Sequence, residues 1–145
     1  MDVSALLQKY NQPVPRYTSY PTAVHFNNEI PQKHYAELLA SLNTRESVSL
    51  YVHIPFCHVL CHYCGCHTKV VNSYSPVKAY VETLIKEIHL VGKKLNSSPP
   101  VSQLHFGGGS PNFLEEDDIA DIISTLRQYF DLSLIHISEP TRPLD

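Results

Sequence analysis

One stretch decides how the chain is organised: Tyr51-Val-His-Ile-Pro-Phe-Cys-His-Val-Leu-Cys-His-Tyr-Cys-Gly-Cys66, which contains all four cysteines of the 145 residues. Just before the cysteines, Ser49 to Ile54 is a short apolar run with β-branched residues. It ends at Pro55, which has no N–H to give to a sheet. This run predicts a buried strand. The cysteines then lie on a loop at the carboxyl end of a strand, where α/β proteins collect ligands and catalytic groups.

The cysteines have the spacing of a metal-binding loop. Cys57, Cys61 and Cys64 form a C-x3-C-x2-C pattern, and Cys66 follows two residues later. Thiolates so close in sequence can converge on one soft metal centre. A cubic iron–sulfur cluster normally takes four thiolates, so a three-cysteine loop would leave one iron open to an outside ligand.

Two other uses of the cysteines remain open at this point. In a zinc knuckle the fourth ligand would be Cys66 or one of the neighbouring histidines, which are His58, His62 and His67. A disulfide pair is less favoured, because the start of the chain shows no secretory segment and clustered cysteines in a cytosolic chain more often bind metal.

Residues 1–47 predict a helical and irregular amino-terminal arm. Val3 to Tyr10 has the apolar spacing of a short helix, and Pro31 to Leu42 predicts a second one. Between them, three prolines exclude a regular helix from residues 11–21. This segment is either an arm that packs over a domain edge or a lid near a substrate with carboxylates, with Arg16 as the candidate anion contact.

Residues 48–131 predict an α/β fold. The first strand and its loop are followed by a helix with Ser75 as N-cap and Pro76 as first residue. A second strand is predicted at 101–106, and a second helix with an acidic first turn at 115–130. The order strand, helix, strand, helix predicts parallel strands joined by right-handed crossovers.

A glycine-rich turn, Gly107-Gly-Gly-Ser-Pro111, follows the second strand at once. Glycines allow positive φ and let the backbone approach a ligand closely. The alternative is a tight turn from strand to helix with no ligand.

At these residues the chain resembles a known family. An aromatic residue, Tyr63, directly before the last cysteine of the pattern resembles the signature of the radical S-adenosylmethionine (radical SAM) superfamily. Within it the chain is similar to the oxygen-independent coproporphyrinogen III oxidases (dehydrogenases) of haem biosynthesis, over about residues 5–130 of a longer family chain. The segments that carry this resemblance are Lys9-Tyr-Asn11, Pro15-Arg-Tyr-Thr-Ser-Tyr-Pro21, Tyr51-Val-His-Ile-Pro-Phe-Cys57, Cys66 and Leu104-His-Phe-Gly-Gly-Gly-Ser-Pro111.

The resemblance implies a fold and a set of site residues. The fold would be the first two βα units of a partial (β/α)6-type radical SAM barrel. A [4Fe–4S] cluster would be held by Cys57, Cys61 and Cys64, and its open iron would bind S-adenosylmethionine. The residues carried over as cofactor-binding are Tyr51, Tyr63, Gly108, Gly109 and Ser110, the last standing where the family usually has Thr.

The resemblance also implies a reaction. One-electron reduction of S-adenosylmethionine would give a 5′-deoxyadenosyl radical that abstracts hydrogen from the propionates of coproporphyrinogen III. Loss of carbon dioxide and an electron would leave two vinyl groups and give protoporphyrinogen IX. The one-electron donor is not identified by the sequence. Cys66 and Arg16 are further candidates for functional roles.

Two alternatives to this enzyme stay open. One is a related radical SAM or haem-trafficking protein of the same branch, but such relatives tend to lack the cysteine that Cys66 provides. The other is a zinc-binding module without catalysis. Zinc requires neither Tyr63 nor the glycine-rich turn, so both features count against it.

Composition narrows the partners and the location. The formal net charge is −3, with 17% charged and 43% hydrophobic residues, which does not favour nucleic acid as a partner. No apolar run reaches the length of a membrane helix, and the first residues lack the basic and apolar regions of a signal peptide. We therefore expect a cytoplasmic protein, away from membranes. We also expect the intact protein to be a monomer.

The carboxyl end has a different character. Leu132-Ser-Leu-Ile-His-Ile-Ser-Glu-Pro-Thr-Arg142 does not resemble the family but is identical to the translation of a transposase-type sequencing adapter. We therefore expect residues 132–145 to be a non-native tail, so that the chain is an amino-terminal fragment that is inactive alone. The alternative is an ordinary polar tail.

Overall fold

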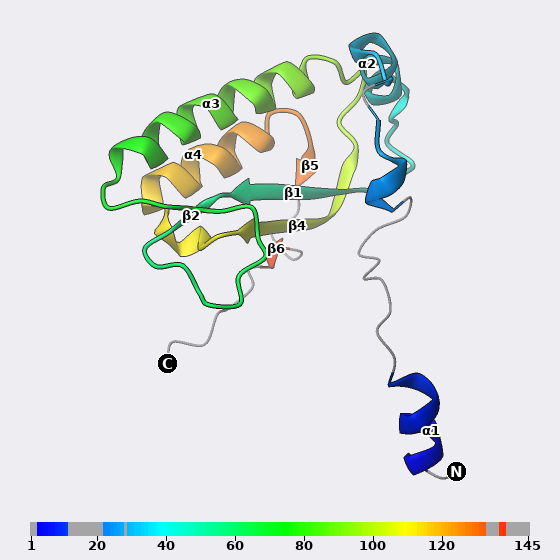
Figure 1. The fold of residues 1–145 in the computed structure, drawn as a ribbon. Coiled ribbons are helices and arrows are strands. Elements are labelled where there is room, and N and C mark those ends of the chain that lie inside the picture. The colour runs from blue at the N-terminus through cyan, green and yellow to red at the C-terminus, as the bar shows by residue number, and fades with distance from the viewer. Residues whose placement is uncertain (1–2, 12–21, 28, 133–136, 139–145) are drawn as a thin grey trace. The chain divides into compact units, whose positions relative to one another are not determined.

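The computed structural model describes residues 3–11, 22–27, 29–132 and 137–138 (Figure 1). The chain divides into two compact units, Met1–Pro31 and Gln32–Asp145. The first contains helix α1 (Val3–Tyr10), as the sequence predicts, and the 3-10 turn η1 (Ala23–His25). The predicted division at 47/48 lies inside the second unit, and the predicted domain boundaries stay a prediction.

The second unit is built on two long parallel strands. Strand β1 (Val48–Ile54) pairs with β4 (Pro100–Gly108), and the pairing continues without a break from Ser49 opposite Gln103 to Ile54 opposite Gly108. The short strands β5 (Asp131–Leu132) and β6 (Ile137–Ser138) also pair with β4 in parallel. The predicted parallel arrangement is confirmed.

Two helices cover one face of this sheet (Figure 1). Helix α3 (Ser75–Gly92) connects β1 to β4, and α4 (Glu116–Leu126) follows β4 after the 3-10 turn η2 (Pro111–Phe113). The core lies between the helices and the sheet, where burying one large aliphatic side chain stabilises the fold by about 1.5–3 kcal/mol. Its most deeply buried aliphatic residues are Ile54, Val77, Val81, Leu104 and Ile122.

The start of α3 differs from the prediction. Tyr74, not Ser75, is the N-cap residue, and its side chain makes no capping hydrogen bond. Tyr74 already has helical backbone angles, φ −78° and ψ −20°. Its side chain is instead engaged with α4, as the hydrogen bonds below show. The Ser-Pro pattern therefore predicted the wrong cap residue, at a position where the neighbouring tyrosine makes a tertiary contact.

The end of α4 also differs from the prediction. The helix ends at Leu126 rather than Phe130, because the backbone tightens into bonds from Gln128 N–H to Thr125 O and from Tyr129 N–H to Leu126 O. This shorter turn brings the chain back to the sheet at β5. The apolar residue Phe130 is buried, as its place in the predicted stripe requires.

Helix α2 (Gln32–Ser41) confirms the helix predicted at 31–42. Its carboxyl end is held by the connection between α3 and β4: Asn96 Nδ2 donates to Ala40 O over 2.9 Å, and Ser97 Oγ donates to Leu42 O over 3.0 Å. Its tyrosine and one leucine, Tyr35 and Leu38, are exposed.

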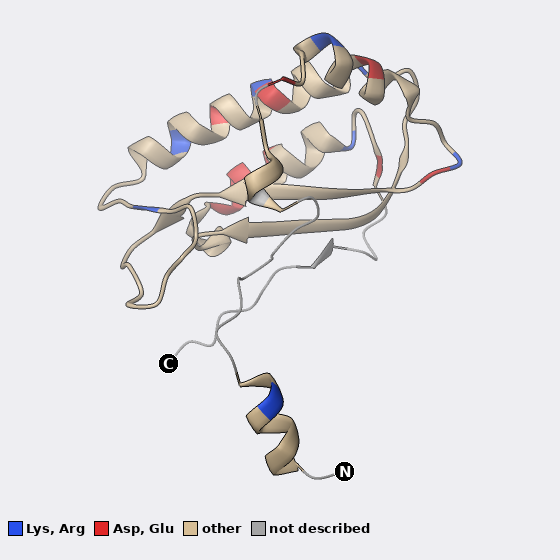
Figure 2. Ribbon diagram, turned by 45° about the vertical axis from the view of Figure 1, so that its right-hand side comes forward, with Lys and Arg blue, Asp and Glu red and all other residues tan. Residues whose placement is uncertain are grey.

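Charges of both signs are spread over α2 and α3 (Figure 2). Along α3, Lys78, Glu82, Lys86 and Glu87 alternate in sign. Such a helix has no single-sign face for a polyanion. Among the helices of the described ranges, none is both long and apolar enough to cross a membrane.

Candidate metal and cofactor site

The carboxyl ends of β1 and β4 lie side by side, with Ile54 opposite Gly108. The chain beyond each strand is then tied to the other. Gly109 N–H donates to Ile54 O over 2.8 Å, and Ser110 N–H donates to Phe56 O over 2.8 Å. The cysteine loop and the glycine-rich turn thus begin at the same sheet edge, as expected for parallel strands.

The cysteine loop, residues 58–68, is closed at its base by a second small sheet. Strand β2 (Phe56–Cys57) pairs in parallel with β3 (Lys69–Val70). Lys69 N–H donates to Pro55 O over 2.7 Å, and Val71 N–H donates to Cys57 O over 3.1 Å. These bonds fix where the loop leaves and returns.

The three predicted cluster ligands differ in burial. Cys57 is buried, with its Sγ 3.9 Å from Ser110 Oγ. Cys61 and Cys64 are half-buried, and one turn joins them because Cys64 N–H donates to Cys61 O over 3.1 Å. Cys64 Sγ is 3.9 Å from Thr68 Oγ1. Cys66 is exposed, and none of the four cysteines forms a disulfide.

The chemistry of these donors fits an iron–sulfur cluster. Three unoxidised thiols on one loop are the ligands that such clusters use. Within the described part of the chain, however, no three His, Cys, Asp or Glu side chains stand close enough together to hold a metal ion. The chain therefore has the side chains that a cluster needs. That the three thiols converge on one metal centre stays a prediction.

The glycine triplet makes room for neighbouring side chains. A Cβ on Gly107 would lie 2.8 Å from the Tyr51 ring, and one on Gly108 would lie 2.8 Å from the His53 ring. A Cβ on Gly109 would lie 2.3 Å from Phe56 O and 2.9 Å from Cys57 Sγ. Gly108 also has φ +109°, which L residues avoid. The close approach predicted for a ligand is thus made here by the chain's own β1 edge.

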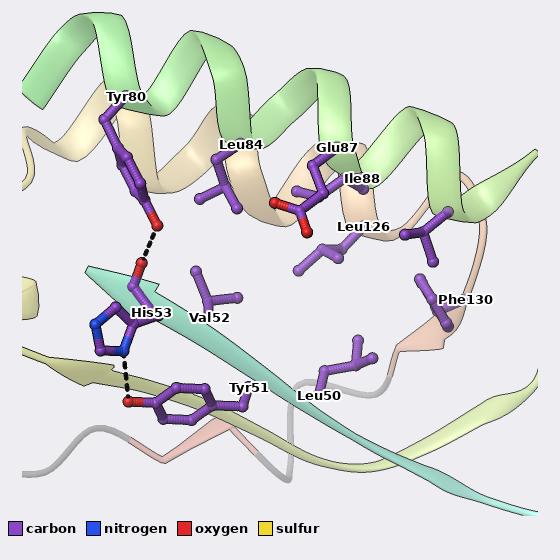
Figure 3. A pocket seen from close by; sticks show the side chains of 11 residues that line it. Leu50, Tyr51, Val52, His53, Tyr80, Leu84, Glu87, Ile88, Leu126 and Phe130 are labelled. Carbon is purple, nitrogen blue, oxygen red and sulfur yellow. Dashed lines mark hydrogen bonds between the residues drawn. The ribbon is translucent and has the colours of Figure 1, made fainter. Parts of the chain in front are cut away.

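A hydrogen-bonded chain runs along this edge from β1 to the cysteine loop, and Figure 3 shows its part from Tyr51 to His53. Tyr51 Oη lies 3.1 Å from His53 Nδ1, and His53 Nε2 lies 2.9 Å from the carbonyl oxygen of His67. Since the carbonyl can only accept, Nε2 donates to it, and in the neutral imidazole Nδ1 then accepts from the tyrosine. Tyr80 Oη donates to His53 O over 2.5 Å.

A groove of about 220 Å³ lies between β1 and α3, next to this chain (Figure 3). Most of its lining is apolar, and Glu87, His53 and the two tyrosines are its polar groups. Burial raises the pKa of Tyr80, with Glu87 and Tyr51 adding to the effect. The lining residues are Leu50, Tyr51, Val52, His53, Tyr80, Leu84, Glu87, Ile88, Val91, Leu126 and Phe130.

A buried carboxylate lies in the first turn of α4. Asp118 is 1% exposed and accepts hydrogen bonds from Tyr74 Oη and Lys78 Nζ, each over 2.5 Å. Burial alone would raise the pKa of Asp118, but these two bonds outweigh it and lower the pKa. The pKa of Lys78 is raised, chiefly by its bond to Asp118.

The remaining predicted site residues are less enclosed. Tyr63 is 87% exposed and Tyr51 is 58% exposed. Arg16 lies outside the described residues. Sequence reasoning did not select His53, Tyr74 or Asp118. The alternation along β1 could have placed His53 on the same face as Tyr51, but no local signal marks the other two.

Comparisons with known proteins find several relatives that share one name. The chain is 43% identical over 129 residues to an oxygen-independent coproporphyrinogen III oxidase of Mannheimia haemolytica, covering 89% of this chain and 87% of that protein. It is 44% identical over 117 residues to the protein of the same name from Bradyrhizobium diazoefficiens, covering 81% of this chain and 26% of that one. It is 42% identical over 126 residues to the protein of that name from Escherichia coli K12. That match covers 87% of this chain and 27% of the Escherichia coli protein.

A solved structure is similar as well. It is titled as coproporphyrinogen III oxidase (HemN) from Escherichia coli, a radical SAM enzyme, and matches with a TM-score of 0.79 and 34% identity. The match covers 95% of this chain and 30% of that one, so the fold is part of the larger one. No protein-family model matches the chain.

Proposed function

Because the chain belongs to the family of oxygen-independent coproporphyrinogen III oxidases, we propose that it provides the cluster- and cofactor-binding part of an oxidoreductase of haem biosynthesis. The reaction is the oxidative decarboxylation of coproporphyrinogen III to protoporphyrinogen IX without oxygen. The observation that carries this proposal is the meeting of the cysteine loop and the glycine-rich turn at one sheet edge, where Cys57 lies 3.9 Å from Ser110.

In this proposal Cys57, Cys61 and Cys64 hold a [4Fe–4S] cluster. When bound, the cluster and S-adenosylmethionine supply the one-electron chemistry that starts oxidation of the propionates. The loop is fixed at its base, so Cys57 is held by the sheet, while the other two thiols lie on the loop itself. Metal binding is coupled to the folding of its site, so we assign the gathering of the thiols to cluster assembly.

The chain's own residues would orient the cofactor and exclude water around it. Gly108, Gly109 and Ser110 present backbone and a hydroxyl beside Cys57, and Tyr51 and Tyr63 provide aromatic faces. The positive φ of Gly108 turns the backbone at the end of β4. Cys66 and Arg16 are assigned supporting roles, Arg16 toward a substrate carboxylate.

The chain spans 26–27% of the Bradyrhizobium and Escherichia coli relatives. Substrate contacts made by the rest of such a protein are therefore missing from these residues. We propose that the 145-residue chain binds the cluster but does not turn over coproporphyrinogen III by itself. Residues 132–145 are proposed to be the non-native tail.

For the protein that carries the activity, we propose a cytoplasmic monomer with coproporphyrinogen III as substrate and a one-electron donor as partner. Nucleic acid and membranes have no role in it. The mixed signs along α3 support this choice, because a nucleic-acid surface needs clustered cations.

Anaerobic expression of the whole chain, followed by reconstitution with iron and sulfide, tests the cluster. We expect about four irons per chain and a broad visible absorption band that bleaches on reduction. Cys57→Ser should abolish the band. Cys66→Ser is the control, because it removes an exposed cysteine outside the three proposed ligands, and it should retain the band. Stoichiometric zinc in a folded chain would favour the zinc module and contradict the proposal.

A further inference from the structure

Two consecutive residues at the start of the cysteine loop contact Ser110, in the glycine-rich turn, and Phe113, which ends η2. Cys57 Sγ lies 3.9 Å from Ser110 Oγ. The next residue, His58, stacks on Phe113 with ring centroids 4.1 Å apart and an angle of 29° between the planes. Because Ser110 and Phe113 flank and end η2, both contacts hold the loop against the same 3-10 turn.

Phe113 is itself backed by a second ring. Tyr74 lies nearly parallel to it, at 9° with centroids 6.4 Å apart, within the range of offset aromatic pairs. Phe113 and Tyr74 are both half-buried. The three rings form a row, which we call the aromatic row, of His58, Phe113 and Tyr74.

The hydroxyl of Tyr74 fixes the inner end of this row. It donates to Asp118 Oδ2 over 2.5 Å and accepts from Glu115 N–H over 2.9 Å. The second oxygen of Asp118 accepts from Lys78 Nζ. A phenol with two such partners has one orientation, and Tyr74 and Glu115 are the N-cap residues of α3 and α4.

We propose that Tyr74 is a positioning residue for the metal centre, which sets Phe113 through the aromatic row and so holds His58 and Cys57 in place. This inference rests on the proposed function in that Cys57 is taken as a cluster ligand. It adds a residue with no metal-binding chemistry of its own, located on the far side of η2 from the cysteine loop.

Joining α3 to α4 does not by itself require Tyr74. Near the other end of the same helix pair, the Tyr129 hydroxyl lies 2.8 Å from His89 Nδ1. Tyr129, like Tyr74, is half-buried, and it has no contact with the loop among those the structure gives. Tyr129→Phe therefore removes a tyrosine hydroxyl that joins α3 to the turn after α4, and it serves as the control for Tyr74→Phe.

The test measures the accessibility of Cys57 in the whole 145-residue chain without cluster. A maleimide reagent labels the thiols, and peptide mass spectrometry gives the labelling rate of Cys57 relative to the exposed Cys66 in the same molecule. Since Cys57 is buried, its labelling reports local opening of the loop start. Circular dichroism confirms that each variant is folded.

We expect Tyr74→Phe to raise the relative labelling rate about fivefold and Phe113→Ala about tenfold, a tenfold change being ~1.4 kcal/mol of opening free energy. Phe113→Trp, which keeps a stacked ring, should stay within about twofold of the wild-type rate. Tyr129→Phe should do the same. Phe113→Leu replaces Phe113→Ala if the latter does not fold.

Unchanged labelling in folded Tyr74→Phe and Phe113→Ala overturns the inference. An equal rise in Tyr129→Phe also overturns it, because the effect would then be general loosening of the helices. Iron content after anaerobic reconstitution separates the two proposals. If the wild-type chain binds no cluster but the labelling pattern holds, the proposed function fails, and Tyr74 is shown to hold the start of the loop without a metal centre to serve. If the chain binds its cluster and labelling is unaffected, only the positioning role fails.

Discussion

The glycine-rich turn (residues 107–110) and the cysteine loop (residues 58–68) lie at the same sheet edge but are held in different ways. Each of Gly107, Gly108 and Gly109 packs so closely against the chain that a Cβ would meet another atom within 3 Å. In the loop, Gly65 has nothing within 4 Å of a Cβ. The turn is thus shaped by the protein's own atoms, whereas the loop is anchored at its base and by the aromatic row.

This difference indicates a division of labour between the two segments. A packed turn offers a preformed surface to a cofactor, because little conformational entropy remains to be lost on binding. A loop with exposed members such as His62 and Tyr63 can rearrange when thiols bind metal. Substitutions that add the same methyl group at different glycines measure this difference directly.

The largest effect is expected for Gly109→Ala. Its Cβ would lie 2.3 Å from Phe56 O, a backbone atom that cannot move without breaking the bond between Ser110 N–H and Phe56 O. We expect a loss of about 3 kcal/mol in the free energy of unfolding, measured by urea denaturation of the whole chain. A loss below ~0.5 kcal/mol would show that the turn is as adaptable as the loop.

A smaller loss is expected for Gly92→Ala, at the end of α3. Its Cβ would lie 2.2 Å from Tyr129 Cγ, but a side chain can shift where backbone cannot. Overpacking of about 2–3 kcal/mol is partly offset by the ~1 kcal/mol that alanine contributes to a helix, so we expect a net loss of about 1–2 kcal/mol. In Tyr129→Ala protein the same substitution should become neutral or stabilising, since the obstructing ring is gone. The measurement is the free energy of unfolding in urea, for Gly92→Ala against wild type and for Gly92→Ala with Tyr129→Ala against Tyr129→Ala alone.

For Asp118→Asn we expect a loss of about 1 kcal/mol at neutral pH, at the lower end of the range for a buried hydrogen-bonded carboxylate because Lys78 is half-exposed. The folded-state pKa of Asp118 lies below its ordinary value of 3.8. Its contribution is therefore complete above that value and is lost as pH falls through the lowered pKa. Thermal unfolding should show the wild-type chain to be more stable than Asp118→Asn at pH 6, and this difference in stability should be smaller at pH 3. A difference that grows on acidification would contradict the assigned direction.

The smallest effect is expected for Gly65→Ala in the cysteine loop. Gly65 does not have positive φ, and there is open space around it. The change should lie between zero and about 0.5 kcal/mol of stabilisation, because alanine restricts the unfolded chain. The free energies of unfolding of Gly65→Ala and Gly109→Ala, measured together by urea denaturation, check this prediction. A large loss would mean that the loop is packed as closely as the turn.

Much of the architecture could be predicted from local pattern. The apolar run before Pro55, the spacing of Val77, Val81 and Ile88, and the glycines after β4 indicated strand, helix and turn, and the structure has each of them. Local signals failed where a tertiary contact competed with them. Ser75 looked like a cap, but Tyr74 holds that place because its hydroxyl is bonded to α4.

The candidate site divides in the same way. Cysteine spacing identifies a possible ligand set without any structure, because three thiols within eight residues are close enough in sequence to share one metal centre. Asp118 illustrates the opposite case. In the sequence it is one of three acids in the first turn of a helix, suited to the helix dipole. Only the packing of α3 against α4 buries it and pairs it with residues 40 and 44 positions earlier.

By itself, then, the sequence determined the order of elements, the parallel sheet and the family, because these depend on periodicity and motif spacing within short windows. The tertiary structure alone decided what fills the space beside each glycine, which acid is buried and which rings support the start of the cysteine loop. Those features depend on contacts between residues far apart in the sequence, such as His58 with Phe113 and Tyr74 with Asp118. No local pattern encodes such contacts, since they exist only once the two helices lie on the sheet.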